Sequence, residues 1–136
     1  TCVAQIPGAG AAGGMGGGCV AFLGAKLKSG IESVLDTVEF DAMLEGTDLV
    51  ITGEGRIDGQ SIHGKVISGI AGRTKPRNIP LLALVGAIAE DADDLGVTAM
   101  FSIDRSARDF REYADQSAVY YQRTLEDILR LIRAVK

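Results

Sequence analysis

The sequence predicts an α/β fold in which helices cover both faces of a mainly parallel sheet, giving three layers. Three short apolar runs, at residues 48–52, 80–86 and 97–103, are predicted to be strands. The run Pro80–Val85 is apolar throughout, which is typical of a central parallel strand buried on both faces. Segments with helical spacing of apolar residues separate the runs, and this alternation indicates a parallel sheet. We therefore expect the three strands to lie parallel in one sheet.

The other elements follow from the same spacing. Before the first of these strands we expect a short strand at residues 2–6, helices at 19–29 and 30–36, and a short helix from Phe40 that ends at Gly46. Later we expect a helix from near Ser61 to residue 74 and an acidic helix at 90–95. An amphipathic last helix, at 112–135, should bury Tyr113, Val119, Leu125, Ile128, Leu129 and Ile132. Because no linker or internal repeat divides the sequence, residues 1–136 are expected to form a single α/β domain.

Composition narrows the class of protein. The net charge of −4 argues against a general nucleic-acid surface, which needs clustered Lys and Arg. No apolar run approaches the roughly 18 residues of a membrane helix, so we expect no membrane partner. Cys2 and Cys19 have neither metal-like spacing nor a disulfide framework, which favours a reducing compartment, the cytoplasm. The chain opens Thr1-Cys2-Val3 without Met, and we expect it to be a piece of a longer protein.

The stretch after the first buried strand is the main candidate site. Gly53, Gly55 and Gly59 alternate there with Glu54, Arg56 and Asp58. Ligands of α/β sheets bind outside the carboxyl ends of the strands, where glycine lets the backbone approach them. Glu54 and Asp58 are suited to general-base work or to binding Mg²⁺. Alternatively, Arg56 is their structural ion-pair partner, or the whole segment is a solvated loop.

A second glycine-rich segment occupies residues 8–18, with seven glycines in eleven residues. Such a run is a poor helix, at about 1 kcal/mol per glycine relative to alanine, but it exposes N–H groups to an anion. Gly8, Gly10 and Gly13 also match the dinucleotide fingerprint. The acidic partners at the right distance, Glu32 and Asp36, fall inside a helical pattern, so the match is weak.

The segment from Gly59 to Val66 resembles a phosphate-binding P-loop except at its last position. Val66 stands where a Ser or Thr hydroxyl would bind Mg²⁺, which argues against a true P-loop. Lys65 can still hold a phosphate as a point charge. Ser61 is suited to capping the following helix. His63, the only histidine, supports neither a metal site nor a catalytic triad.

Taken together, several of these segments closely resemble the bacterial glycerate kinase family. The resemblance rests on residues 7–16, 21–25, 48–61 and Gly64–Lys65, and it continues through residues 80–85 and 101–103. It implies ATP- and Mg²⁺-dependent transfer of a phosphoryl group to a hydroxyl of glycerate, giving a phosphoglycerate. It also implies a two-domain α/β kinase of which this chain is an incomplete, carboxyl-terminal piece.

The residues supply the parts that this chemistry needs, namely positioning and neutralisation of charge. We expect Glu54, Arg56, Asp58 and Lys65 to be catalytic, with Glu54 and Asp58 also binding the metal. The expected nucleotide-binding residues are Gly8, Gly10, Gly13, Gly14, Gly53, Gly55 and Ser61. Because the resemblance places the cleft between two domains, the 136-residue chain alone should be inactive. Its exposed sheet edge should favour self-association. The alternative is a nucleotide- or dinucleotide-binding module without kinase activity.

Overall fold

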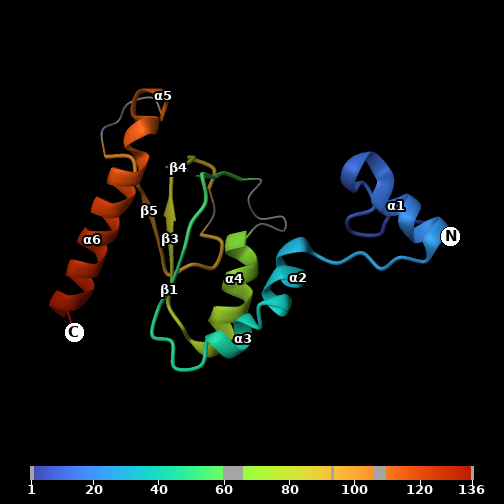
Figure 1. The fold of residues 1–136 in the computed structure, drawn as a ribbon, viewed down its shortest axis with the longest axis horizontal. Coiled ribbons are helices and arrows are strands. Elements are labelled where there is room, and N and C mark those ends of the chain that lie inside the picture. The colour runs from blue at the N-terminus through green and yellow to red at the C-terminus, as the bar shows by residue number, and fades with distance from the viewer. Residues whose placement is uncertain (1, 60–65, 93, 106–109, 136) are drawn as a thin grey trace. The chain divides into compact units, whose positions relative to one another are not determined.

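The computed structural model describes residues 2–59, 66–92, 94–105 and 110–135 (Figure 1). The chain forms two compact units, residues 1–40 and residues 41–136, which are considered separately below. That the whole chain forms one domain stays a prediction. Within the described ranges, no helix is both long and apolar enough to cross a membrane.

The second unit contains a parallel sheet of three strands. These are β1 (Val50–Thr52), β3 (Leu81–Val85) and β5 (Ala99–Ser102), in the order β1-β3-β5. Val50 pairs with Leu81, and Leu82 pairs with Ala99, both in parallel register. The predicted parallel arrangement is therefore confirmed. All five residues of β3 are buried, as expected for a central strand.

Helices cover both faces of this sheet, which confirms the three-layer α/β fold. Alternate residues of β3 point to opposite faces. Ala83 and Val85 pack with Ile67 of α4 (Val66–Thr74), while Leu82 and Leu84 pack with Ile128 of α6 (Ser117–Val135). In Figure 1, α4 and α6 accordingly flank the sheet on its two sides.

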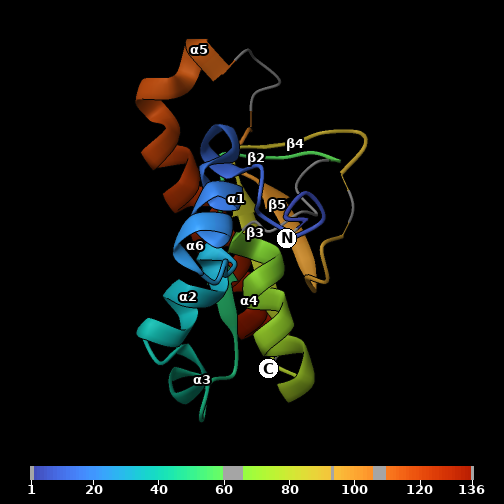
Figure 2. The same ribbon diagram turned by 90° about the vertical axis from the view of Figure 1, so that its right-hand side faces the viewer.

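A second, two-stranded parallel sheet was not predicted. It pairs β2 (Arg56–Ile57) with β4 (Ala87–Ile88). Val50 pairs with Leu81 and Arg56 with Ala87, so the partners are 31 residues apart in both sheets. The second sheet thus continues the register of the first beyond a break at Gly53 and Gly86. Figure 2 shows β2 and β4 side by side.

The connections of the second unit agree in part with expectation. The short helix α3 (Phe40–Met43) forms and is followed by a turn with Gly46 at φ +72°. The predicted end of α4 is also correct, because the 3₁₀ helix η1 (Lys75–Arg77) follows it. The start of α4 near Ser61 lies outside the described residues.

Two predictions in this unit were wrong. Residues 90–92 and 94–95 form no helix, because the Asp94 carboxylate accepts a hydrogen bond from Gly96 N–H (2.9 Å) and favours a turn. The last helix is divided into α5 (Phe110–Tyr113), the 3₁₀ helix η2 (Ala114–Gln116) and α6. Val119 and Leu129 of the predicted stripe are exposed, because they point away from the face of α6 that buries Thr124 and Ile128.

The first unit contains α1 (Ala11–Leu23) and α2 (Gly30–Thr37), and it corrects three predictions. Residues 2–6 form turns instead of a strand. The helix predicted at 19–29 ends at Leu23, where Gly24 adopts a left-handed C-cap and Ala25 N–H donates to the Cys19 carbonyl (3.1 Å). The glycine run does enter a helix, although Ala12, Gly13 and Gly14 have non-helical angles.

Close backbone packing explains two of the glycines in α1, Gly16 and Gly17. A Cβ on Gly16 would lie 2.5 Å from the Gly8 carbonyl oxygen. Gly17 N–H donates to the Ala9 carbonyl (2.8 Å), which holds the helix against the preceding turn. This tertiary contact outweighs the low helix propensity of glycine.

Candidate active site at the strand ends

A cavity of about 670 Å³ opens at the carboxyl ends of the parallel strands in the second unit. Its walls come from the segments that follow β1, β3 and β5, together with α5 and α6. The lining residues are Gly53, Glu54, Gly55, Arg56, Leu84, Val85, Gly86, Ala87, Ile103, Tyr113 and Tyr121. The sequence-predicted loop therefore lies at the place where α/β sheets bind their ligands.

Backbone hydrogen bonds hold the predicted loop against the end of β3. Gly86 N–H donates to the Glu54 carbonyl (3.0 Å), and Ala87 N–H donates to the Gly55 carbonyl (3.1 Å). Ala89 N–H donates further along to the Ile57 carbonyl (2.9 Å). These bonds fix the main chain on both sides of Arg56. The Cα of Arg56 is therefore held in a defined position at the cavity.

Two glycines allow the loop and β3 to approach each other this closely. A Cβ on Gly53 would lie 2.6 Å from the Leu84 carbonyl oxygen, and one on Gly86 would lie 2.4 Å from the Gly55 carbonyl oxygen. Both obstacles are backbone atoms, which cannot swing away as a flexible side chain can. The glycines at 53 and 86 are therefore required by packing, whether or not they also contact a ligand.

The cavity lining includes two charged side chains from the loop. They belong to Glu54 and Arg56, and the Arg56 side chain is 67% exposed. Arg56 Nε lies 4.0 Å from Asp58 Oδ2, so the structure brings these two groups near each other. An exposed pair at this distance contributes at most about 1 kcal/mol to stability. This one contact therefore adds little to stability, and whether Arg56 serves chiefly as an ion-pair partner stays an open alternative.

The described part of the chain holds no group of three or more His, Cys, Asp or Glu side chains suited to a metal. Mg²⁺ commonly takes only one or two protein carboxylates and completes its shell with water and phosphate oxygens. Glu54 and Asp58 are of the right chemical type for that arrangement. Their role as metal ligands stays a prediction.

Several residues that line the cavity were not predicted from the sequence to belong to the site. The sequence indicates Ile103 only as a strand residue and Tyr113 only as part of a helical stripe, and no local pattern marks Tyr121 as a site residue. Tyr113 is 2% exposed, and its ring lies 5.5 Å from that of Tyr120, which packs α5 against α6. These residues lie roughly 50 to 70 positions after the loop in the sequence, so no local spacing could have connected them with it.

Ser102, at the end of β5, links the cavity walls. Its hydroxyl donates to the Gly86 carbonyl (3.1 Å) and accepts from Asp104 N–H (3.0 Å). Gly86 in turn donates its N–H to the Glu54 carbonyl. Ser102 therefore fixes Gly86 between β5 and the Glu54 loop, and we interpret it as a positioning residue.

Removing this hydroxyl should loosen the loop. We expect Ser102→Ala in the full-length protein to cost about 1 kcal/mol of stability and to lower kcat/KM roughly fivefold, while Ser102→Thr retains both. Steady-state kinetics and thermal unfolding measure the two effects. Ser117→Ala removes an exposed hydroxyl that donates to the Ala114 carbonyl and serves as the control. Equal kcat/KM in Ser102→Ala and Ser117→Ala would contradict the positioning role.

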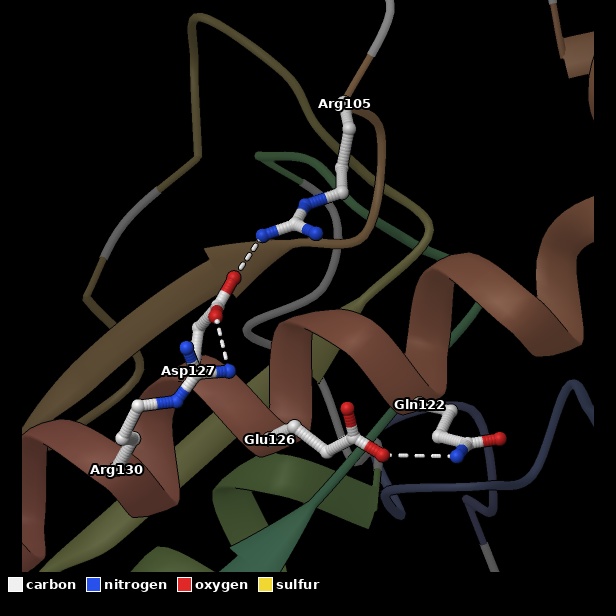
Figure 3. Close-up of polar contacts among 5 residues, drawn as sticks. All are labelled: Arg105, Gln122, Glu126, Asp127 and Arg130. Atoms are coloured by element: carbon white, nitrogen blue, oxygen red, sulfur yellow. Dashed lines mark hydrogen bonds and ion pairs between the residues drawn. The ribbon is translucent and has the colours of Figure 1, made fainter.

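An ion-pair cluster attaches α6 to the segment after β5 (Figure 3). Arg105 pairs with Oδ2 of Asp127. Arg130 Nη2 lies 3.1 Å from Oδ1 of the same carboxylate. On the same helix, Gln122 donates to Glu126 (2.8 Å). The Arg105–Asp127 pair joins α6, which also contains Tyr121, to the segment after β5, but such exposed pairs each contribute at most about 1 kcal/mol.

Of the other predicted site residues, Ser61 and Lys65 are outside the described residues, as is His63, which was not predicted to belong to a site. Gly8, Gly10, Gly13 and Gly14 belong to the first unit, where Gly10 and Gly14 help to line a separate cavity of about 410 Å³. The strand expected before the dinucleotide fingerprint is not formed, which removes its main structural support.

Known proteins resemble this chain over most of its length. A glycerate kinase of Bacillus subtilis (strain 168) is 41% identical over 132 residues, which cover 95% of this chain and 35% of that protein. A glycerate 2-kinase of Escherichia coli (strain K12) is 48% identical over 104 residues, covering 74% of this chain and 27% of that protein. The chain thus spans about a third of the length of these relatives.

A solved structure agrees with this similarity. It is of a Salmonella typhimurium LT2 protein assigned as glycerate kinase 2, with a TM-score of 0.71 and 38% identity. The match covers 93% of this chain and 33% of that one. The model of the glycerate kinase family matches residues 1–133. The chain therefore belongs to the glycerate kinase family.

Proposed function

We propose that the protein containing this chain transfers the γ-phosphoryl group of ATP to a hydroxyl of glycerate, giving a phosphoglycerate. Family membership supports the class of reaction. The main support for the proposal is the cavity at the strand ends. Glu54 and Arg56 line it together with glycine-rich backbone. Both substrates are anions, and phosphoryl transfer needs chiefly positioning and neutralisation of charge.

The loop offers a separate role for each charge. Arg56 can neutralise a phosphate or the glycerate carboxylate, for which a guanidinium fork is well shaped. Glu54 and Asp58 divide between them the acceptance of the hydroxyl proton and the binding of Mg²⁺, in either order. When bound, Mg²⁺ would neutralise phosphate charge. A cytoplasmic location fits the two free cysteines and is proposed with the activity.

The direct test is product formation by the full-length protein. With ATP, Mg²⁺ and glycerate, ADP and a phosphoglycerate should form in equal amounts, and chelation of Mg²⁺ should stop the reaction. Nucleotide binding without transfer to glycerate would instead favour the binding-module alternative. Inactivity of the 136-residue chain alone, and its self-association through a sheet edge, stay predictions.

The cationic residues should matter strongly for turnover. In the full-length protein, we expect Arg56→Ala and Lys65→Ala each to lower glycerate-dependent ATP consumption at least tenfold, or about 1.4 kcal/mol of transition-state stabilisation. A coupled ADP assay measures the rates. Arg133→Ala, which removes an exposed cation from the last turn of α6, should leave them unchanged. If both substitutions gave near-normal rates, neither cation would act on the phosphoryl group.

A further inference from the structure

The lining of the cavity at the strand ends is mostly apolar and includes two charged side chains. Leu84, Val85, Ile103 and Tyr113 line the cavity and are all buried. Tyr121, from α6, also lines it and is 43% exposed, unlike the four buried residues. Glu54 and Arg56 supply the charged side chains among the described lining residues.

The apolar and the charged parts of the lining match different ends of a nucleoside triphosphate, the base and the phosphates. A purine is a flat ring whose faces stack on aromatic side chains, and such contacts contribute about 1–3 kcal/mol. A triphosphate needs cations and backbone N–H groups, which the apolar lining formed by Leu84, Ile103 and Tyr113 does not offer. Small-molecule sites commonly combine apolar walls with a few polar groups in a volume of roughly 300–1,000 Å³. The cavity volume of about 670 Å³ lies within this range.

Glycerate fits the apolar part of the lining poorly. It is a small anion with hydroxyl groups, and burial of its carboxylate against aliphatic walls would remove water without giving a partner. Arg56, whose side chain is 67% exposed, is the part of the lining suited to glycerate or to a phosphate.

We propose that this cavity is the nucleoside subsite, with the purine held against Tyr121 and the phosphates directed toward the Gly53–Arg56 loop. The inference rests on the proposed function, because that function makes ATP the phosphoryl donor. It adds Tyr121 and Ile103 as residues that recognise the base. Tyr113 acts as a positioning residue for the wall, because its ring packs against Tyr120 of α6.

The test separates base recognition from phosphate recognition. The full-length protein is titrated at equilibrium with ATP and, separately, with inorganic triphosphate. Tyr121→Ala should weaken ATP binding roughly tenfold and leave triphosphate binding unchanged. Tyr121→Phe keeps the ring and should retain normal ATP affinity. Leu131→Ala, which truncates a residue of α6 that is 61% exposed and outside the cavity, is the matched control.

The outcomes distinguish this inference from the proposed function. Unchanged ATP affinity in Tyr121→Ala, in a protein that phosphorylates glycerate, would overturn the subsite and leave the kinase activity intact. Equal weakening of ATP and triphosphate would also overturn it, because the effect would then concern the phosphates. A tenfold loss for ATP alone, in a protein that does not act on glycerate, would support the subsite and refute the kinase proposal.

Discussion

Replacing the loop carboxylates is expected to reduce catalysis by about two orders of magnitude. Glu54→Gln and Asp58→Asn preserve the side-chain shape but remove the negative charge that binds a metal or accepts a proton. General acid–base groups typically contribute 10²–10⁴-fold, so we expect kcat of each full-length variant to fall about 100-fold. The prediction applies to both residues because the proposed chemistry uses both.

Steady-state kinetics at saturating ATP and glycerate, repeated over a range of Mg²⁺ concentrations, measure these losses. A metal ligand should show partial recovery at high Mg²⁺, whereas a proton acceptor should not. Glu45→Gln changes an exposed carboxylate outside the cavity and should retain normal kcat. If either loop variant kept a normal kcat at all Mg²⁺ concentrations, that residue would have no part in the chemistry.

Gly86→Ala is expected to be the most destabilising single change at the site. The added Cβ would lie 2.4 Å from the Gly55 carbonyl oxygen, so the loop must move away from the end of β3. Overpacking of this kind typically costs about 1–3 kcal/mol, and backbone atoms yield least, so we expect about 3 kcal/mol. Activity should fall as well, because the hydrogen bond from Gly86 N–H to the Glu54 carbonyl would be strained.

Thermal unfolding of the full-length protein measures this effect. Gly72→Ala is the matched control, because Gly72 lies in the exposed surface of α4 and its added Cβ would meet no atom within 4 Å. That change should be neutral or slightly stabilising, since alanine favours a helix more than glycine does. Equal unfolding midpoints for the two variants would show that the loop adjusts without cost.

The central layer of the fold could be predicted because its pattern is local. Pro80–Val85 is apolar at consecutive positions, and the structure buries all five residues of β3. The strands β2 and β4 could not be predicted in this way. Each has only two residues and includes an exposed one, Arg56 or Ile88, so neither shows a strand period.

Contacts between distant residues account for the other differences. Gly16 and Gly17 are helical because the helix packs on the Gly8 and Ala9 carbonyls, which propensity alone does not reveal. At the site, the alternation of glycine and charge drew attention to the segment after β1, and residues 53–56 of it line the cavity, although Arg56 and Ile57 form β2. The aromatic wall could not be foreseen, because Tyr121 reaches the cavity only through the packing of α6 on the sheet.

The most direct test of the account is the glycerate-dependent rate of ADP formation by the full-length Glu54→Gln, Asp58→Asn double variant. Its thermal unfolding midpoint is measured on the same sample. If the loop after β1 carries phosphoryl transfer, the rate should fall to that seen without glycerate, while the unfolding midpoint stays within a few degrees of the wild-type value. A folded double variant with near-wild-type turnover would contradict the assignment and make the loop a structural connection.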